Sequence, residues 1–98
     1  MKGKESPKRK LSKEDGFSEA MRLRIKKLYK EKDMSLSELA RAAGVPYSTL
    51  SSFMNYQSNS ITITTLDKLC KGLGTTLAGF FSDEELFHKF GPKDFKEI

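Results

Sequence analysis

The sequence has few of the side chains on which catalytic and metal sites depend. It contains no tryptophan, one histidine and one cysteine. A single cysteine cannot form an intramolecular disulfide or a zinc site with several cysteine ligands, and it suits a reducing compartment. His88 is distant in sequence from Cys70 and no carboxylate pattern joins them, so we interpret Cys70 as a packing residue. Without a glycine-rich phosphate-binding loop either, the chain is expected to have no catalytic residues, no metal site, no cofactor and no enzymatic activity.

Long apolar runs are also missing. No run approaches the roughly 18 residues that span a bilayer, and no signal-peptide core follows the basic N-terminus. Apolar residues make up 37% of the chain and charged residues 32%, which indicates a folded interior beneath a solvated surface. At 98 residues we expect one domain, cytoplasmic, with no membrane partner and no separate small-molecule effector domain.

Positive charge is concentrated at one end of the chain. Residues 1–32 carry twelve Lys or Arg and five Asp or Glu, a net charge of +7, whereas residues 33–98 carry six and eight, a net charge of −2. A basic segment of this kind can act as an electrostatic arm for phosphate, or it can serve only to keep the chain soluble. Both interpretations remain open. Residues 1–16 hold almost nothing apolar, so we expect a disordered tail there.

Two short amphipathic helices with a tight turn between them form the clearest pattern. Apolar residues at i, i+3, i+4 and i+7 share one face of a first helix over residues 36–43. Ser35 and Glu38 have the spacing of a capping box at its start, and Gly44 fits a left-handed C-cap at its end. A second helix is predicted from near Pro46, because the fixed φ of proline suits a first helical turn.

The second helix is predicted to have a polar face without charge. Thr49, Leu50 and Phe53 cluster on its apolar side, and Ala40 lies where the two helices must cross closely. The opposite face carries uncharged side chains, namely Tyr47, Ser48, Ser51, Ser52 and Asn55. The small residue at the crossing, the glycine between the helices and the apolar side of each helix together indicate a helix-turn-helix.

Further helices are predicted on both sides of this motif. One is expected to run from an N-cap at Ser18 to about Lys32, with an outer basic face, and another from an N-cap at Thr62 to a stop at Gly74. A short helix is expected over residues 75–81. The outer face of the first is predicted to carry Arg22, Lys26, Lys27 and Lys30, either solvated or against phosphates. The predicted core residues are Met21, Ile25, Leu28, Tyr29, Ile63, Leu66, Leu69, Cys70 and Leu73.

The C-terminal segment carries more apolar surface than a final short helix requires. Ser82 and Glu85 have the spacing of another capping box, which predicts a helical turn or two before Gly91. The aromatic residues Phe87 and Phe90 could pack back on the bundle or form part of a homodimer interface. Both alternatives remain open.

The helix-turn-helix residues and their flanks resemble the lambda-repressor-like (Cro/repressor, xenobiotic-response-element) helix-turn-helix family. The resemblance covers roughly residues 25–81 and includes the segments 34–40, 58–66 and 69–77. It implies an all-α fold, a five-helix lambda-repressor-like DNA-binding bundle, here with a short C-terminal helical extension. Such domains bind operator DNA, usually as dimers. The expected division is a basic tail over 1–16, the helix-turn-helix domain over 17–82, and a helical turn and tail over 83–98.

The resemblance implies a binding surface on the second helix of the motif. Tyr47, Ser48 and Ser52 match the positions from which related repressors touch base edges, and Ser51 lies on the same face. The expected phosphate contacts lie on the first helix and after the second, at Ser37, Arg41, Asn55, Tyr56 and Gln57.

Two departures from the family pattern affect this expectation. Leu36 stands where related proteins often have a DNA-contacting glutamine, and Tyr29 and Met54 replace a common arginine–glutamate pair. We predict that Tyr29 and Met54 contact each other without loss of the fold, because well-packed apolar groups often substitute for a buried ion pair. The expected function is a sequence-specific, double-stranded DNA-binding repressor from a bacterium or phage. The alternative is an adaptor of the same fold that binds a partner protein.

Overall fold

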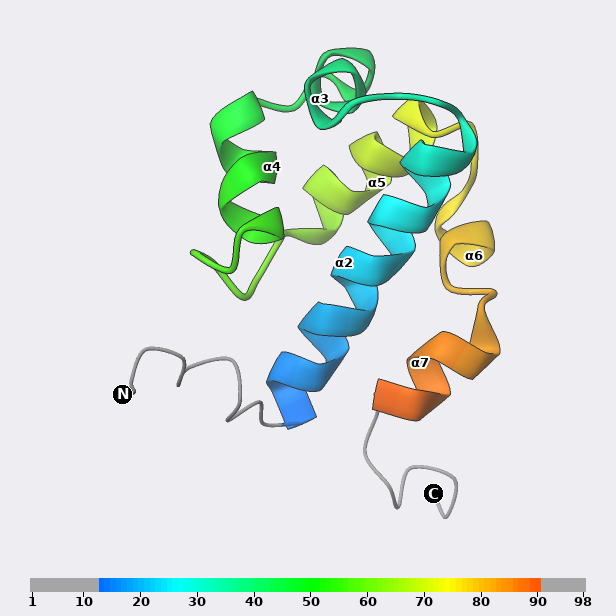
Figure 1. Cartoon of the computed structure of the whole chain (residues 1–98). Helices are drawn as coiled ribbons and strands as arrows, with labels where there is room; N and C mark the ends of the chain where they lie inside the picture. Colours follow the sequence, from blue (N-terminus) through cyan, green and yellow to red (C-terminus); the bar gives the residue numbers. More distant parts are fainter. Residues whose placement is uncertain (1–12, 91–98) are drawn as a thin grey trace.

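The computed structural model of the chain describes residues 13–90. This range forms six α-helices and contains no strand (Figure 1). The helices are α2 (Lys13–Glu31), α3 (Leu36–Ala43), α4 (Tyr47–Met54), α5 (Ile63–Gly72), α6 (Leu77–Phe80) and α7 (Glu84–Phe90). The long helix α2 crosses the molecule, α3 packs on α5, and α7 lies along α2. The all-α bundle with a C-terminal helical extension is therefore confirmed. None of these helices has both the length and the apolarity needed to cross a bilayer.

The helix α2 begins at Lys13, five residues before the predicted N-cap. Ser18 lies inside the helix and is buried, and its hydroxyl donates a hydrogen bond to the carbonyl of Asn59. The prediction of Ser18 as an N-cap was therefore wrong. The first turns of α2 show no apolar period, so the pattern did not predict this early start.

The predicted boundaries of the helix-turn-helix are confirmed. Ser35 Oγ accepts from the Glu38 amide at 3.1 Å, and Glu38 Oε1 accepts from the Ser35 amide at 2.8 Å, completing the capping box. Gly44 has φ 70°, a left-handed conformation that a residue without Cβ adopts readily. Pro46 is the N-cap of α4.

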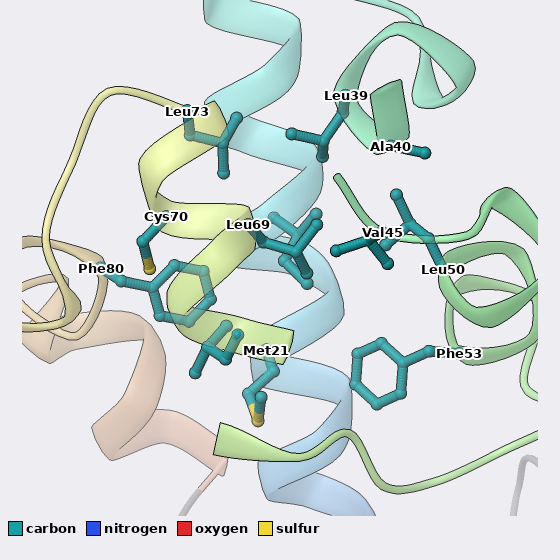
Figure 2. Close-up of a cluster of buried hydrophobic side chains, with 12 residues drawn as sticks. Met21, Leu39, Ala40, Val45, Leu50, Phe53, Leu69, Cys70, Leu73 and Phe80 are labelled. Carbon is teal, nitrogen blue, oxygen red and sulfur yellow. The ribbon is translucent and has the colours of Figure 1, made fainter. Parts of the chain in front are cut away.

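One apolar core joins α2, α3, α4, α5 and α6 (Figure 2). Its buried members are Met21, Ile25, Leu39, Ala40, Val45, Leu50, Phe53, Leu66, Leu69, Cys70, Leu73 and Phe80. Leu28 and Tyr29 of the predicted stripe, with Met54, pack half-buried against it, and a direct contact between Tyr29 and Met54 stays a prediction. Ala40 is 3% exposed, as expected for a residue at a close helix crossing.

Two residues predicted to lie on apolar faces are exposed instead. Ile63 is 62% exposed because it is the first residue of α5, directly after the N-cap Thr62, and has no preceding turn to pack against. Thr49 is exposed because the buried stripe of α4 consists of Leu50 and Phe53, at i and i+3. The predictions for Ile63 and Thr49 were wrong.

The C-terminal helix is capped by a different residue from the one predicted. Asp83 Oδ1 accepts from the Leu86 amide at 3.2 Å, whereas the Ser82 hydroxyl donates to the carbonyl of Gly79 at 2.7 Å. The predicted capping box of Ser82 and Glu85 was therefore wrong by one residue. Both Ser82 and Asp83 can cap a helix, and the positive charges on α2 favour the aspartate.

The half-buried Phe87 packs within its own chain. Its ring centroid lies 5.1 Å from that of Phe81, 6.0 Å from that of Phe17 and 6.1 Å from that of Phe80. These contacts support the expectation that the C-terminal segment packs back on the bundle. The side chain of Phe90 lies outside the described residues.

Candidate nucleic-acid interface

The helix α4 carries the residues predicted to read bases. Its inner face is fixed in the core, where Leu50 and Phe53 are almost completely buried. Its outer face is polar: Tyr47 is 53% exposed and Ser48 is exposed, while Ser51 and Ser52 are half-buried. The exposed side of this helix therefore offers one aromatic ring and several hydroxyl groups.

The segment after α4 carries three of the predicted phosphate contacts. Asn55, Tyr56 and Gln57 are exposed, and the Asn55 side-chain amide donates to Ser51 Oγ at 3.0 Å. Tyr56 has φ 67°, and the Gln57 amide donates to the carbonyl of Ser52 at 2.8 Å, so the chain turns back sharply at this point. This left-handed turn places the three side chains directly beside the end of α4.

The other two predicted phosphate contacts lie on α3. Ser37 and Arg41 are both exposed and share one face, since they are four residues apart on a helix. Arg41 is the last charged residue before a long neutral stretch, because residues 42–66 contain no Lys, Arg, Asp, Glu or His. The candidate interface is therefore polar and neutral at its centre, with basic residues only on its flanks.

Thr49 is exposed on α4 and not turned to the core as predicted. Sequence reasoning also misplaced Arg22, predicted on the outer basic face of the first helix but only 3% exposed. Lys26, Lys27 and Lys30 are exposed, as predicted. The helical period contained a signal for Arg22: Ser18, Arg22 and Ile25 fall at i, i+4 and i+7 and therefore share one face.

The buried guanidinium of Arg22 holds the end of α4. Its Nε donates to the carbonyl of Phe53 at 2.6 Å, and its Nη2 donates to the carbonyl of Ser58 and to Asn59 Oδ1, both at 2.8 Å. Its Nη1 lies 3.5 Å from Glu19 Oε1. A hydrogen bond to Glu19, with a smaller effect of burial, raises the pKa of Tyr56.

The described residues contain no cluster of three or more His, Cys, Asp or Glu that could hold a metal ion. The protruding helix α4, the turn after it and the preceding helix α3 make up the candidate binding surface. A model of the Cro/C1-type helix-turn-helix DNA-binding domain matches residues 24–85, more than half of the chain. No curated protein and no solved structure gave a significant match. The chain therefore belongs to the Cro/C1-type helix-turn-helix family, whose members are DNA-binding regulators.

Proposed function

We propose that this protein is a sequence-specific regulator of transcription, acting as a repressor, that places α4 in the major groove of double-stranded DNA. The observation that carries the proposal is the two-sided character of α4: Leu50 and Phe53 fix it in the core while Tyr47 and Ser48 face outward. An α-helix fits the major groove of B-DNA, where each base pair presents a distinct pattern of donors and acceptors.

The outer face of α4 would make the base contacts. The Tyr47 ring is of a size to pack on a thymine methyl group, and its hydroxyl can reach a base or a phosphate. Ser48, Ser51 and Ser52 can donate to or accept from either base, which makes each contact weakly selective. Selectivity would then depend on several modest contacts together.

Phosphate contacts would hold the helix in register. Ser37 and Arg41 on α3 and Asn55, Tyr56 and Gln57 after α4 flank the reading helix on two sides. In the helix-turn-helix docking geometry the first helix crosses the backbone and the second enters the groove. This division of contacts supports the proposed orientation.

Repression would require no activity beyond occupancy, because a module bound over a promoter excludes polymerase. We propose that two copies bind as a homodimer on paired half-sites, in the cytoplasm of a bacterium or a phage-infected cell. The ring of Phe17, 45% exposed beside Phe87, is the described apolar group that such a contact at the C-terminal end would use.

One observation favours a second candidate, a protein-interaction adaptor. The exposed face of α4 carries no positive charge, and residues 42–66 carry no charge at all. Interfaces between proteins are depleted of charge at their centre, whereas DNA contacts depend strongly on Lys and Arg. The two functions differ in how binding responds to salt.

The test is selection of double-stranded DNA from a random pool, followed by footprinting and by affinity measurements across salt concentrations. We expect an enriched motif protected on the major-groove side and a steep decrease in affinity with salt, about 0.9 log units per log unit of salt for each phosphate contact. No enrichment, or salt-insensitive binding to a protein partner alone, would contradict the proposal.

A matched pair of charge variants localises the interface. Ser48→Asp puts a negative charge on the outer face of α4. Ala78→Asp puts the same charge at an exposed position of α6, on the far side of the bundle from α4 (Figure 1). We expect Ser48→Asp to abolish binding and Ala78→Asp to leave the selected motif and its footprint unchanged. Equal effects of the two variants would show that α4 is not the reading helix.

A further inference from the structure

The N-terminal half of α2, through Arg22, is bonded to the end of α4, although the two residues are more than thirty positions apart in sequence. The residues involved, Ser18, Glu19 and Arg22, all precede residue 24, where the family match begins. We propose that Arg22 is a positioning residue for DNA recognition, which fixes the end of α4 and the loop over residues 55–60 before DNA binds. This inference rests on the proposed function, because it assigns the loop a task in phosphate contact.

Three hydrogen bonds from one side chain connect α2 to this loop. The Arg22 guanidinium reaches the carbonyl of Phe53 in the last turn of α4 and two groups further along, the carbonyl of Ser58 and the side-chain oxygen of Asn59. The planar fork of arginine can satisfy such a set at once, whereas the ammonium of lysine is a compact charge without that geometry. Arg22 therefore ties the helix end and the far side of the loop to the same group.

Two aromatic rings complete the contact. The Arg22 guanidinium carbon lies 4.6 Å from the ring centroid of Phe53 and 4.2 Å from that of Tyr56. Tyr56 is the residue with the left-handed backbone, a conformation that is unfavourable for a residue with a Cβ. The stacking and the hydrogen bond to Glu19 give the side chain of Tyr56 interactions that a glycine at this position would lack.

The loop itself is not packed into the core. Residues 55–60 include no buried side chain, and only Ser58 is half-buried. Backbone bonds to the carbonyl of Ser52 order its first half. Ser18, whose hydroxyl donates to the carbonyl of Asn59, adds a second connection from α2. Because the loop is not packed into the core, the bonds from Arg22 and Ser18 contribute to fixing its position.

The buried charge of Arg22 is not itself available to DNA. Its side chain is 3% exposed and faces the carboxylate of Glu19. Its effect on binding is therefore indirect: it orders Asn55, Tyr56 and Gln57 in advance, so that binding does not have to immobilise them. Ordering one such side chain on binding costs roughly 2- to 13-fold in affinity, so losing the order of all three should cost at least about 10-fold.

The test compares Arg22→Lys and Ser18→Ala with Ile25→Val. Arg22→Lys keeps the charge but loses the fork, and Ser18→Ala removes one hydroxyl from a helix that tolerates alanine, so it remains informative if Arg22→Lys does not fold. Ile25→Val is the control, because it lowers stability from a buried site on the same helix that has no bond to the loop. All affinities for the selected DNA motif are measured where each variant is fully folded.

We expect Arg22→Lys to weaken binding to the motif at least about 10-fold, Ser18→Ala to weaken it less, and Ile25→Val to leave it within about twofold. Hydrogen exchange in the DNA-free protein should become faster at the amides of Gln57 and Ser58 in the first two variants only. Affinity losses no larger than that of Ile25→Val would overturn the positioning role, even if stability falls.

The exchange measurement separates this inference from the proposed function. If the native protein binds no duplex, both proposals fail, but faster loop exchange in Arg22→Lys would still show that α2 holds the loop. If the native protein binds its motif and loop exchange is unchanged in both variants, only the inference about Arg22 is wrong.

Discussion

Gly44, after α3, and Gly72, at the end of α5, are required for different physical reasons. Gly44 is needed for its backbone: its φ of 70° is left-handed, and a Cβ built there would meet nothing within 4 Å. Gly72 is needed for space, because a Cβ there would lie 3.0 Å from the Cα, Cβ and N atoms of Ala43. The close approach of α3 to α5 therefore depends on a hydrogen at residue 72.

We expect Gly72→Ala to lower the free energy of unfolding by about 1–3 kcal/mol, because the added methyl forces α3 away from α5. Urea denaturation measures this change. Helix propensity alone would give the opposite sign, since alanine is the better helix former. A gain in stability would therefore contradict the close approach.

The exposed ring of Tyr47 is the residue from which we expect the largest single contribution to base recognition. Tyr47→Ala should lower affinity for the selected motif by about 1–3 kcal/mol and change the sequence preference, without lowering the unfolding midpoint, because the side chain is 53% exposed. Tyr47→Phe separates the ring from the hydroxyl. Unchanged motif preference in Tyr47→Ala would remove this residue from the reading surface.

At the residue scale, sequence reasoning succeeded where one local pattern determines the outcome. Ser35, Glu38 and Gly44 are determined by neighbours three or four residues away, so their roles could be read directly from the sequence. The helical period places Arg22 on a buried face, but its hydrogen-bond partners, like the neighbour of Gly72, lie in distant segments that the pattern does not identify. Which residues of the exposed α4 face touch bases stays a prediction.

At the scale of elements, α7 is attached to α2 by charge as well as by aromatic packing. Asp83 Oδ2 lies 3.3 Å from Lys27 Nζ and 3.7 Å from Arg24 Nη1. Arg24 also donates to the carbonyl of Phe80, at 2.7 Å. The side chain of Asp83 thus both caps α7 and connects it to two cations of α2.

We expect the attachment of α7 to weaken in acid. The Leu86 amide, with Lys27 and Arg24, lowers the pKa of Asp83 below its ordinary value of 3.8. The folded state therefore favours the ionised form, so this contribution is fully present above pH 3.8 and is lost as the pH falls through the lower folded value. The NMR resonances of the Phe87 ring, followed against pH, measure the change.

Asp83→Asn should remove most of the acid response of the Phe87 resonances and loosen α7 already at neutral pH. Asp67→Asn is the matched control, because Asp67 forms only an exposed i,i+4 pair with Lys71 on α5, at 3.1 Å. An identical acid response in native protein and Asp83→Asn would show that another group controls α7.

The boundaries of the helices were harder to predict than their presence. The cap of α7 could not be chosen from sequence because Ser82 and Asp83 are adjacent and both suit the role, and the cations that favour Asp83 lie on a helix more than fifty residues earlier. The early start of α2 was missed for a similar reason. Serine is a common N-cap residue, but the Ser18 hydroxyl bonds to the carbonyl of Asn59, which is distant in sequence.

At the scale of the whole molecule, the positive charge and the proposed reading helix α4 lie in different parts of the chain. Residues 42–66, which include all of α4, are neutral, whereas residues 1–32 carry a net charge of +7. Five basic residues of that segment, Lys2, Lys4, Lys8, Arg9 and Lys10, precede the described part of the chain. Base selection and general attraction to phosphate would therefore be separable by mutation.

Deleting residues 1–12, which leaves α2 intact from Lys13, should weaken binding to motif and unrelated duplexes by similar factors and make the salt dependence less steep. Replacing the five basic residues by glutamine at constant length is the control for length. An unchanged slope in both variants would support the alternative that this segment only keeps the chain soluble.

Because the single thiol is completely buried, its labelling rate can report how often the bundle opens. Cys70 is 0% exposed, and burial raises the pKa of its thiol, so a water-soluble disulfide reagent can attack only after the bundle opens. When reclosing is faster than attack, the labelling rate divided by that of a free thiol equals the equilibrium constant for opening. Comparing the labelling rate with and without duplex DNA would then measure how much DNA binding lowers the equilibrium constant for opening.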